Sequence, residues 1–129
     1  MSKLILNANK FEKALISLEQ IYLKPPSDDR SIIDATIQRF EFTFELFWKL
    51  LKIFLNNKGI QVNYPKDVLK EAFSAGLLDD EFTWLNMLKD RNLTSHTYDE
   101  ALANNIFAHI RLYVPILRKT FDRNKTSFL

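Results

Sequence analysis

Apolar side chains recur along most of the chain at intervals of three and four residues, the spacing of one face of an α-helix. Within the longest such segment, about residues 29–57, a seam with heptad spacing comprises Ile33, Ile37, Phe40, Phe44, Phe47, Leu51 and Phe54. A second stripe on another face comprises Phe42, Leu46, Leu50 and Ile53. A helix that is apolar on two faces is usually buried on both, so we expect one face to pack within this chain and the other to meet a second copy.

Helix-breaking and helix-capping residues divide the pattern into further helices. The prolines at 25 and 26 end the first helix, and Gly59 and Gly76 end the second and third. Thr97 and Glu100 match a capping box, which predicts that the last helix begins there. The predicted helices cover about residues 4–23, 29–57, 65–75, 80–92 and 98–123, followed by a frayed tail at 124–129. We therefore predict an all-α, up-and-down four-helix bundle with one short additional helix, in a single domain of residues 1–129.

Composition and charge narrow the class of protein. The chain has no cysteine, which excludes disulfides, thiolate metal ligands and cysteine nucleophiles. Its net charge of +2 predicts no strong general affinity for nucleic acids or membranes, so any contact with RNA would depend on a local patch. The sequence has no run of 18 apolar residues and no N-terminal stretch typical of a secretion signal, so we expect a cytoplasmic protein.

The most chemically suggestive segment is residues 91–98, Arg-Asn-Leu-Thr-Ser-His-Thr-Tyr, at the predicted junction between the last two helices. A helix N-terminus attracts anions, and the guanidinium of Arg91 is suited to phosphate oxygens. His96 could act as a base near neutral pH, while Thr94, Ser95 and Tyr98 add hydroxyls. These groups are the ingredients of metal-free RNA cleavage, in which the histidine deprotonates a ribose 2′-hydroxyl and the arginine stabilises the charged phosphorus centre. On spacing alone, a structural role is the commoner one, with Arg91 in an ion pair and His96 as a helix cap.

Two carboxylates on the predicted second helix are candidate partners for Arg91. Glu41, Glu45 and Lys49 follow one another at four-residue spacing and share one face. The simpler interpretation is an exposed ladder of ion pairs. The alternative is that Glu41 or Glu45 turns inward and orients Arg91.

Other residues with possible chemistry are expected to be structural. His109 lies within a predicted helix with no partner evident, and we expect it to pack or to face solvent. Trp48 and Trp84 are expected to anchor the core or an interface. The two histidines stand 13 residues apart with no carboxylate at ligand spacing, and no glycine-rich phosphate loop is present, so we expect neither a metal site nor a cofactor.

Four segments, in order, resemble those of a known family: FEFTFELFWK at 40–49, PKDVLKEAFSAG at 65–76, WLNMLKDRN at 84–92 and TSHTY at 94–98. In combination they make the chain similar to the nucleotidyltransferase substrate-binding proteins, a branch of the HEPN superfamily, over about Phe11 to Leu117. Arg91, His96 and Tyr98 match the HEPN pattern R-x4-H-x-Y.

The resemblance implies a HEPN-like bundle that forms homodimers and acts with a minimal nucleotidyltransferase, usually encoded beside it. Related pairs are toxin and antitoxin: the helical subunit is a ribonuclease, and the nucleotidyltransferase silences it by attaching AMP to the motif tyrosine. Carried over residue by residue, Arg91 and His96 would be catalytic, Tyr98 would be modified, and Asn92 would help to shape the motif.

Three functions remain open at this point. The first is a partner and substrate subunit of a nucleotidyltransferase, and the second is a metal-independent endoribonuclease. The third is a structural interaction module without catalysis. The first is preferred, with the second as its chemical content, and the homodimer is expected to form through the second helix and the motif region.

Overall fold

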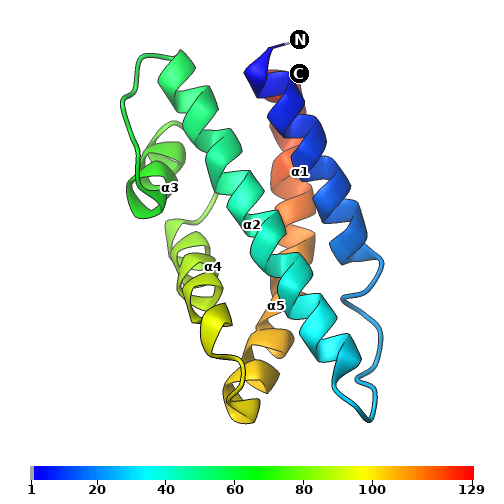
Figure 1. Ribbon diagram of the computed structural model, residues 1–129. Coiled ribbons are helices and arrows are strands. Elements are labelled where there is room, and N and C mark those ends of the chain that lie inside the picture. Colours follow the sequence, from blue (N-terminus) through cyan, green and yellow to red (C-terminus); the bar gives the residue numbers. More distant parts are fainter. Residues whose placement is uncertain (1) are drawn as a thin grey trace.

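The structure is a computed structural model that describes residues 2–129, and these residues form helices with no strand. In chain order the helices are α1 (Lys3–Glu19), α2 (Ser31–Asn57), α3 (Pro65–Ser74), α4 (Glu81–Leu93), the 3₁₀ turn η1 (Thr94–His96), α5 (Glu100–Arg123) and α6 (Lys125–Phe128). α2 lies at the centre, with α1 and α5 on one side and α3 followed by α4 on the other (Figure 1). The predicted all-α bundle is confirmed. α3 is the predicted short extra helix, and α6 is a further helix of one turn that was not predicted.

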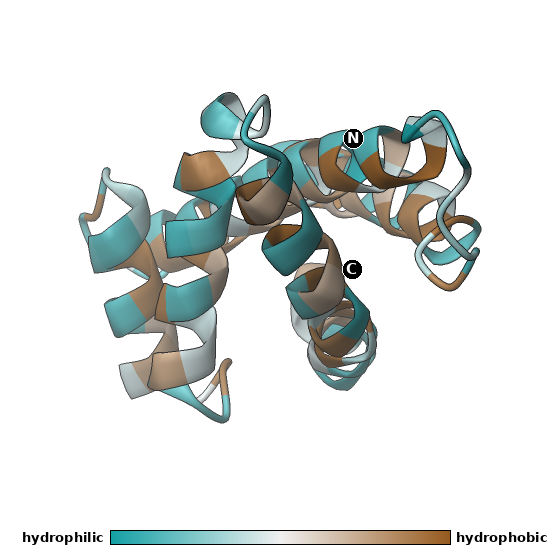
Figure 2. Cartoon of the chain, turned by 90° about the horizontal axis from the view of Figure 1, so that it is seen from below, coloured by the Kyte–Doolittle hydropathy of each residue, from teal (hydrophilic) through white to brown (hydrophobic). Residues whose placement is uncertain are grey.

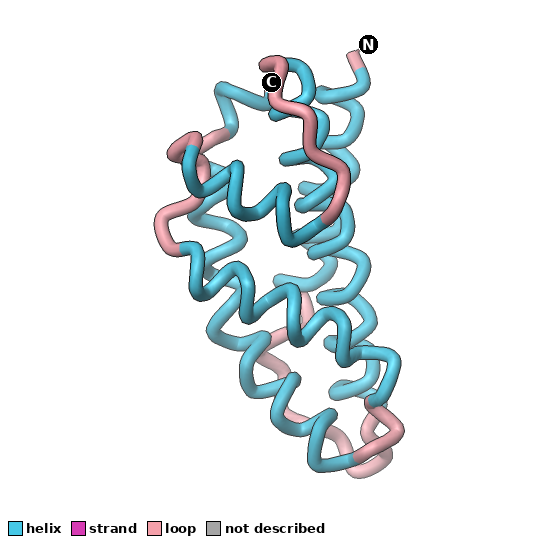
Figure 3. The backbone as a smooth tube through the Cα atoms, turned by 90° about the vertical axis from the view of Figure 1, so that its left-hand side faces the viewer, coloured by secondary structure: helices cyan, strands magenta, loops and turns pink. Residues whose placement is uncertain are grey.

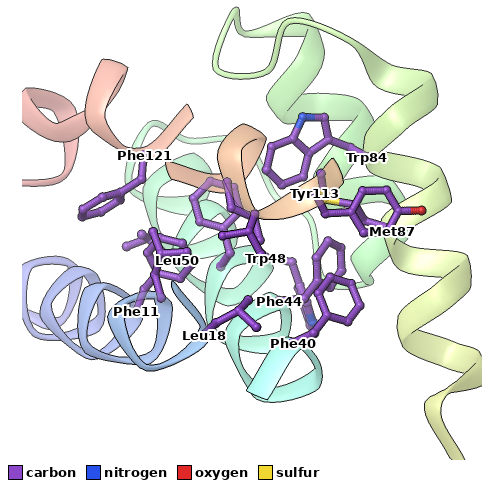
Figure 4. Packing of buried hydrophobic residues seen from close by; sticks show 14 of the residues in the cluster. Phe11, Leu18, Phe40, Phe44, Trp48, Leu50, Trp84, Met87, Tyr113 and Phe121 are labelled. Atoms are coloured by element: carbon purple, nitrogen blue, oxygen red, sulfur yellow. The ribbon is translucent and has the colours of Figure 1, made fainter. Parts of the chain in front are cut away.

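The heptad seam of α2 explains why this helix is central. Six of its seven residues are buried, and the last, Phe54, is half-buried. Phe47 lies between Phe11 of α1 and Trp84 of α4, with ring centroids 4.7 and 5.1 Å away. Phe11 and Trp84 lie on opposite sides of the cluster of buried side chains (Figure 4). Each such aromatic pair adds about 1 kcal/mol beyond the burial of its surface. Trp84 is therefore the core anchor that the sequence predicted, and Trp48 is buried in the same cluster.

The second stripe of α2 is buried only in part. Leu50 is fully buried, Leu46 and Ile53 are half-buried, and Phe42 is 41% exposed. The apolar colouring gathers between the helices, and polar residues cover most of the outside (Figure 2). α2 thus keeps an open apolar patch at Phe42 within this chain.

The first two helices are shorter than predicted at the connection between them. α1 ends at Glu19, and residues 20–23 form turns. α2 begins at Ser31 because Arg30 adopts a left-handed conformation, with φ at +66°. Asp29 precedes this turn and accepts hydrogen bonds from the Ser31 backbone N–H and the Ser27 hydroxyl, which lower the pKa of its carboxyl.

The predicted capping box at Thr97 is wrong. α5 is capped by Asp99, whose carboxylate accepts the backbone N–H of Leu102 at 3.0 Å. The hydroxyl of Thr97 instead donates to the carbonyl of Thr94 at 3.1 Å, within the turn that follows η1. The helix therefore begins two residues later than the Thr-x-x-Glu pattern indicated.

The predicted fraying of residues 124–129 is also wrong. The chain turns at Asn124, whose amide donates to the carbonyl of Leu77 at 2.8 Å. α6 then places Phe128, fully buried, against Phe54 and Phe121, with centroids 5.8 and 6.1 Å away. Phe128 of the tail therefore covers the end of the core at the end of the bundle where the two chain ends lie near each other (Figure 3).

Candidate functional site

Arg91 is fixed by a carboxylate from α2. Its Nε donates to Oε2 of Glu45 at 3.0 Å, and both side chains are about 30% exposed. The other oxygen of Glu45 lies 3.5 Å from Nζ of Lys49. Glu45 therefore takes part in the predicted ladder and also orients Arg91, whereas Glu41 forms no ion pair with any residue in 2–129. A half-exposed pair of this kind contributes about 1 kcal/mol at most, so its main effect is on the direction of the guanidinium.

A cavity of about 540 Å³ opens beside this pair on the outer face of α2. It is lined by Ala14, Gln38, Glu41, Phe42, Glu45, Leu46 and Arg91. Because Nε of Arg91 is used by Glu45, the two Nη groups remain, and neither makes a hydrogen bond with the described part of the chain. The cavity thus presents a directed cation next to the exposed ring of Phe42.

Hydrogen bonds hold the backbone between Arg91 and Tyr98 in place. Thr94 is buried, and its hydroxyl donates to the carbonyl of Arg91 at 2.7 Å. Arg30 donates from Nη2 to the carbonyl of Thr97 at 3.1 Å, so the loop before α2 braces the turn before α5. Thr94 is therefore a structural residue of this segment. Arg30 is a contact that the sequence could not indicate, because it depends on a turn 67 residues away.

His96 and Tyr98 lie together on the surface. Their rings meet edge to face, with centroids 6.1 Å apart, and Tyr98 is 83% exposed. Neither is among the residues that line the Arg91 cavity. Ser95 is exposed, and Asn92 lines a different cavity with Phe82 and Leu93.

The predicted anion site at the start of α5 is occupied by the protein's own acids. Asp99 binds the Leu102 N–H, and Glu100 stands in the first turn. A carboxylate at a helix N-terminus accepts one of the free backbone N–H groups and offsets the positive end of the dipole. Any anion at this segment would therefore compete with Asp99 and Glu100 at the helix end and would rely mainly on Arg91 and His96.

A second polar cluster, unpredicted from the sequence, joins α4 to α5. Asp90 is 7% exposed, and its Oδ2 accepts the Tyr113 hydroxyl at 2.6 Å and His109 Nδ1–H at 2.9 Å. Burial, followed by the hydrogen bond to Asp90, raises the pKa of Tyr113 well above its usual range. His109 is exposed, in line with the expectation that it packs or faces solvent, and Asp90 is a partner that was not evident in the sequence. The four-residue spacing of His109 from Tyr113 was the available signal, but nothing in the sequence linked that pair to Asp90.

The described residues contain neither a group of metal ligands nor a helix able to cross a membrane. Among residues 2–129, no three histidine, aspartate or glutamate side chains lie close enough together to hold a metal ion. None of the helices formed by these residues is long and apolar enough to cross a membrane.

A family model described as nucleotidyltransferase substrate binding protein like matches residues 6–126. The chain belongs to this family. A family relative from Haemophilus influenzae, named "Probable ribonuclease HepT", is 35% identical over 120 residues, which cover 81% of this chain and 82% of the relative.

Solved structures of similar proteins agree with the family assignment. A protein from Thermus thermophilus is 41% identical with a TM-score of 0.81, covering 88% of this chain and 97% of that one. A Haemophilus influenzae protein is 30% identical with a TM-score of 0.77, covering 92% and 98%. The latter structure is described as revealing the fold of a substrate binding domain of a nucleotidyltransferase.

Proposed function

We propose that this chain is the helical partner of a minimal nucleotidyltransferase and that Tyr98 receives AMP from that enzyme. The observation that carries the proposal is the exposure of Tyr98, 83%, on a segment whose backbone is braced by Thr94 and Arg30. An acceptor hydroxyl must enter the active site of another protein, which requires that the side chain protrude from a rigid support.

The transfer moves one AMP unit from ATP to the tyrosine. The Tyr98 oxygen attacks the α-phosphorus of ATP, a new O–P bond forms, and the bond to the β-phosphate oxygen breaks. Pyrophosphate leaves, and the phenolic proton passes to a base. His96, whose ring meets that of Tyr98 edge to face, is the base that we propose in this chain. The product carries a phosphodiester at the edge of the motif and would block access to it.

Association with a minimal nucleotidyltransferase from the same organism tests the partner claim. We expect a complex at micromolar concentrations in sedimentation velocity. Tyr98→Asp should weaken that complex at least about tenfold, because a charge would be buried at the contact. Tyr64→Asp is the matched control, since Tyr64 is also exposed, at 72%, but lies on the loop before α3. Absence of a complex, or equal weakening by both variants, would contradict the claim.

We propose that the motif residues catalyse metal-independent cleavage of RNA and that the protein is the toxin half of a toxin–antitoxin pair. The supporting observation is that Glu45 holds Nε of Arg91 and leaves both Nη groups for a phosphate. His96 would take the proton of a ribose 2′-hydroxyl. The 2′-oxygen would then attack phosphorus, and the bond to the 5′-oxygen would break, with that oxygen protonated as it leaves.

Cleavage of RNA in the presence of EDTA tests this activity. His96→Ala should slow cleavage by about 10²-fold or more, the usual contribution of a general base. His109→Ala is the control because His109 belongs to the separate cluster with Asp90. An unchanged rate in His96→Ala would exclude the proposed base. The third alternative, a structural module, predicts instead that Arg91→Ala destabilises the fold strongly and alters no activity.

A homodimer is part of the same proposal. The exposed Phe42 and half-buried Leu46 on the outer face of α2 form an apolar patch beside Arg91. Pairing of two such faces would bury the patch and bring two copies of Arg91 and His96 near each other. Within one chain, His96 does not line the cavity beside Arg91. The dimer would bring His96 of one copy near Arg91 of the other.

A further inference from the structure

A second cavity, of about 430 Å³, lies between α4 and α5. It is lined on the α4 side by Asn86, Lys89 and Asp90, and on the α5 side by His109, Leu112 and Ile116, among others. Arg91 is not among its lining residues. This volume is in the range of sites for small molecules, roughly 300–1,000 Å³.

The floor of this cavity is the buried carboxylate of Asp90, in which the described residues leave one oxygen free to accept further hydrogen bonds. Oδ2 of Asp90 accepts from both Tyr113 and His109, and the Tyr113 hydroxyl points toward α4 (Figure 4). Oδ1 of Asp90 accepts no hydrogen bond from residues 2–129. The hydrogen bonds that join α4 to α5 use only Oδ2. Oδ1 offers a strong acceptor, held in a fixed direction by two donors on its neighbour.

Around this acidic floor, the rim of the cavity carries a lysine and an amide, and its walls are apolar. Lys89 makes no ion pair with the described residues, and the Asn86 side chain is likewise free of hydrogen bonds with them. The walls contributed by Leu112 and Ile116 are apolar, and Leu112 is 68% exposed. From inside to outside, the cavity therefore offers a hydrogen-bond acceptor, apolar walls and a cation.

We propose that this cavity binds a single nucleotide, with an N–H group of its base on Asp90 and its phosphate on Lys89. A base supplies both a donor edge and flat apolar faces for Leu112 and Ile116. A fatty acid would leave Asp90 without a donor, and an organic cation would meet Lys89 with like charge. The site is separate from Tyr98 and does not depend on the proposed function.

Titration of ¹⁵N-labelled protein with AMP and with GMP, followed by NMR, tests the proposal. We expect saturable shifts at Asn86, Lys89, Leu112 and Ile116, with no comparable shifts at Glu41, Arg91 or His96. Adenosine should bind about fivefold more weakly than AMP because it lacks the partner of Lys89. Ribose 5-phosphate should not saturate, because it lacks the base.

Two variants separate binding from folding. Lys89→Met should weaken AMP binding about fivefold, while Lys13→Met, a matched change on an exposed lysine of α1, should not. Leu112→Glu should weaken it at least as much, because a carboxylate at the exposed rim repels the phosphate. The proposal is overturned if AMP causes no saturable shifts at millimolar concentration, if the shifts map to the motif, or if a free amino acid binds as well as AMP.

Discussion

At the scale of single residues, the adjacent residues Asp90 and Arg91 of α4 contact different helices. Arg91 faces α2 and binds Glu45, while Asp90 faces α5 and binds His109 and Tyr113. Each of these contacts fixes the C-terminal part of α4 from a different side. The direction of the Arg91 guanidinium, on which the proposed RNA chemistry depends, therefore rests on Glu45 of α2, and the Asp90 contacts tie α4 to α5 separately.

Tyr113 gives a prediction about pH. Its folded pKa is raised above the value of about 10 for an unfolded tyrosine, so the fold favours the protonated hydroxyl. The stability that this provides is complete below about pH 10 and is lost as the pH rises further. We expect Tyr113→Phe to cost about 1 kcal/mol at neutral pH and to show a smaller loss of stability than the wild type between about pH 9 and 11. Urea unfolding at several pH values measures this, and parallel curves for the two proteins would refute it.

At the scale of elements, the C-terminal helix is short but stabilising. Phe128 is fully buried against Phe54 and Phe121, although α6 has only one turn. We expect Phe128→Ala to lower the free energy of unfolding by about 3 kcal/mol, through lost burial and a remaining void. Phe82→Ala, at a position 74% exposed, should change it by less than about 0.5 kcal/mol. Equal values for the two variants in chemical denaturation would mean that the tail does not seal the core.

The elements were predictable where periodicity decided them and less so where local caps compete. The heptad seam of α2 was visible because one face of a long helix repeats many times. The start of α5 was not, because Thr97 and Asp99 are both good caps, and the 3₁₀ turn before them decides in favour of Asp99. The tail was missed because a single buried Phe128 has no periodicity to detect.

At the scale of the whole molecule, the open face of α2 predicts a homodimer. We expect sedimentation equilibrium to give a dimer for the wild type and a monomer for Phe42→Glu, because a carboxylate at the centre of the patch would be buried unpaired. Phe82→Glu, on α4, should remain dimeric. A monomeric wild type at high concentration, or dissociation by both variants, would count against this interface.

The candidate site was predictable in part at this scale. The pairing of Arg91 with one of two α2 glutamates was an open alternative, and the structure selects Glu45. The cluster of Asp90, His109 and Tyr113 was not evident in the sequence, because Asp90 is 19 and 23 residues from the other two and only the packing of α4 near α5 brings them together.

The central claim is that Tyr98 accepts AMP from a partner nucleotidyltransferase. Mass analysis of the protein, after incubation with that enzyme and ATP, tests it most directly. We predict a mass increase of one or more AMP units in the wild type and in Tyr64→Phe, and none in Tyr98→Phe. An unmodified wild type, or modification that persists in Tyr98→Phe, would contradict the account.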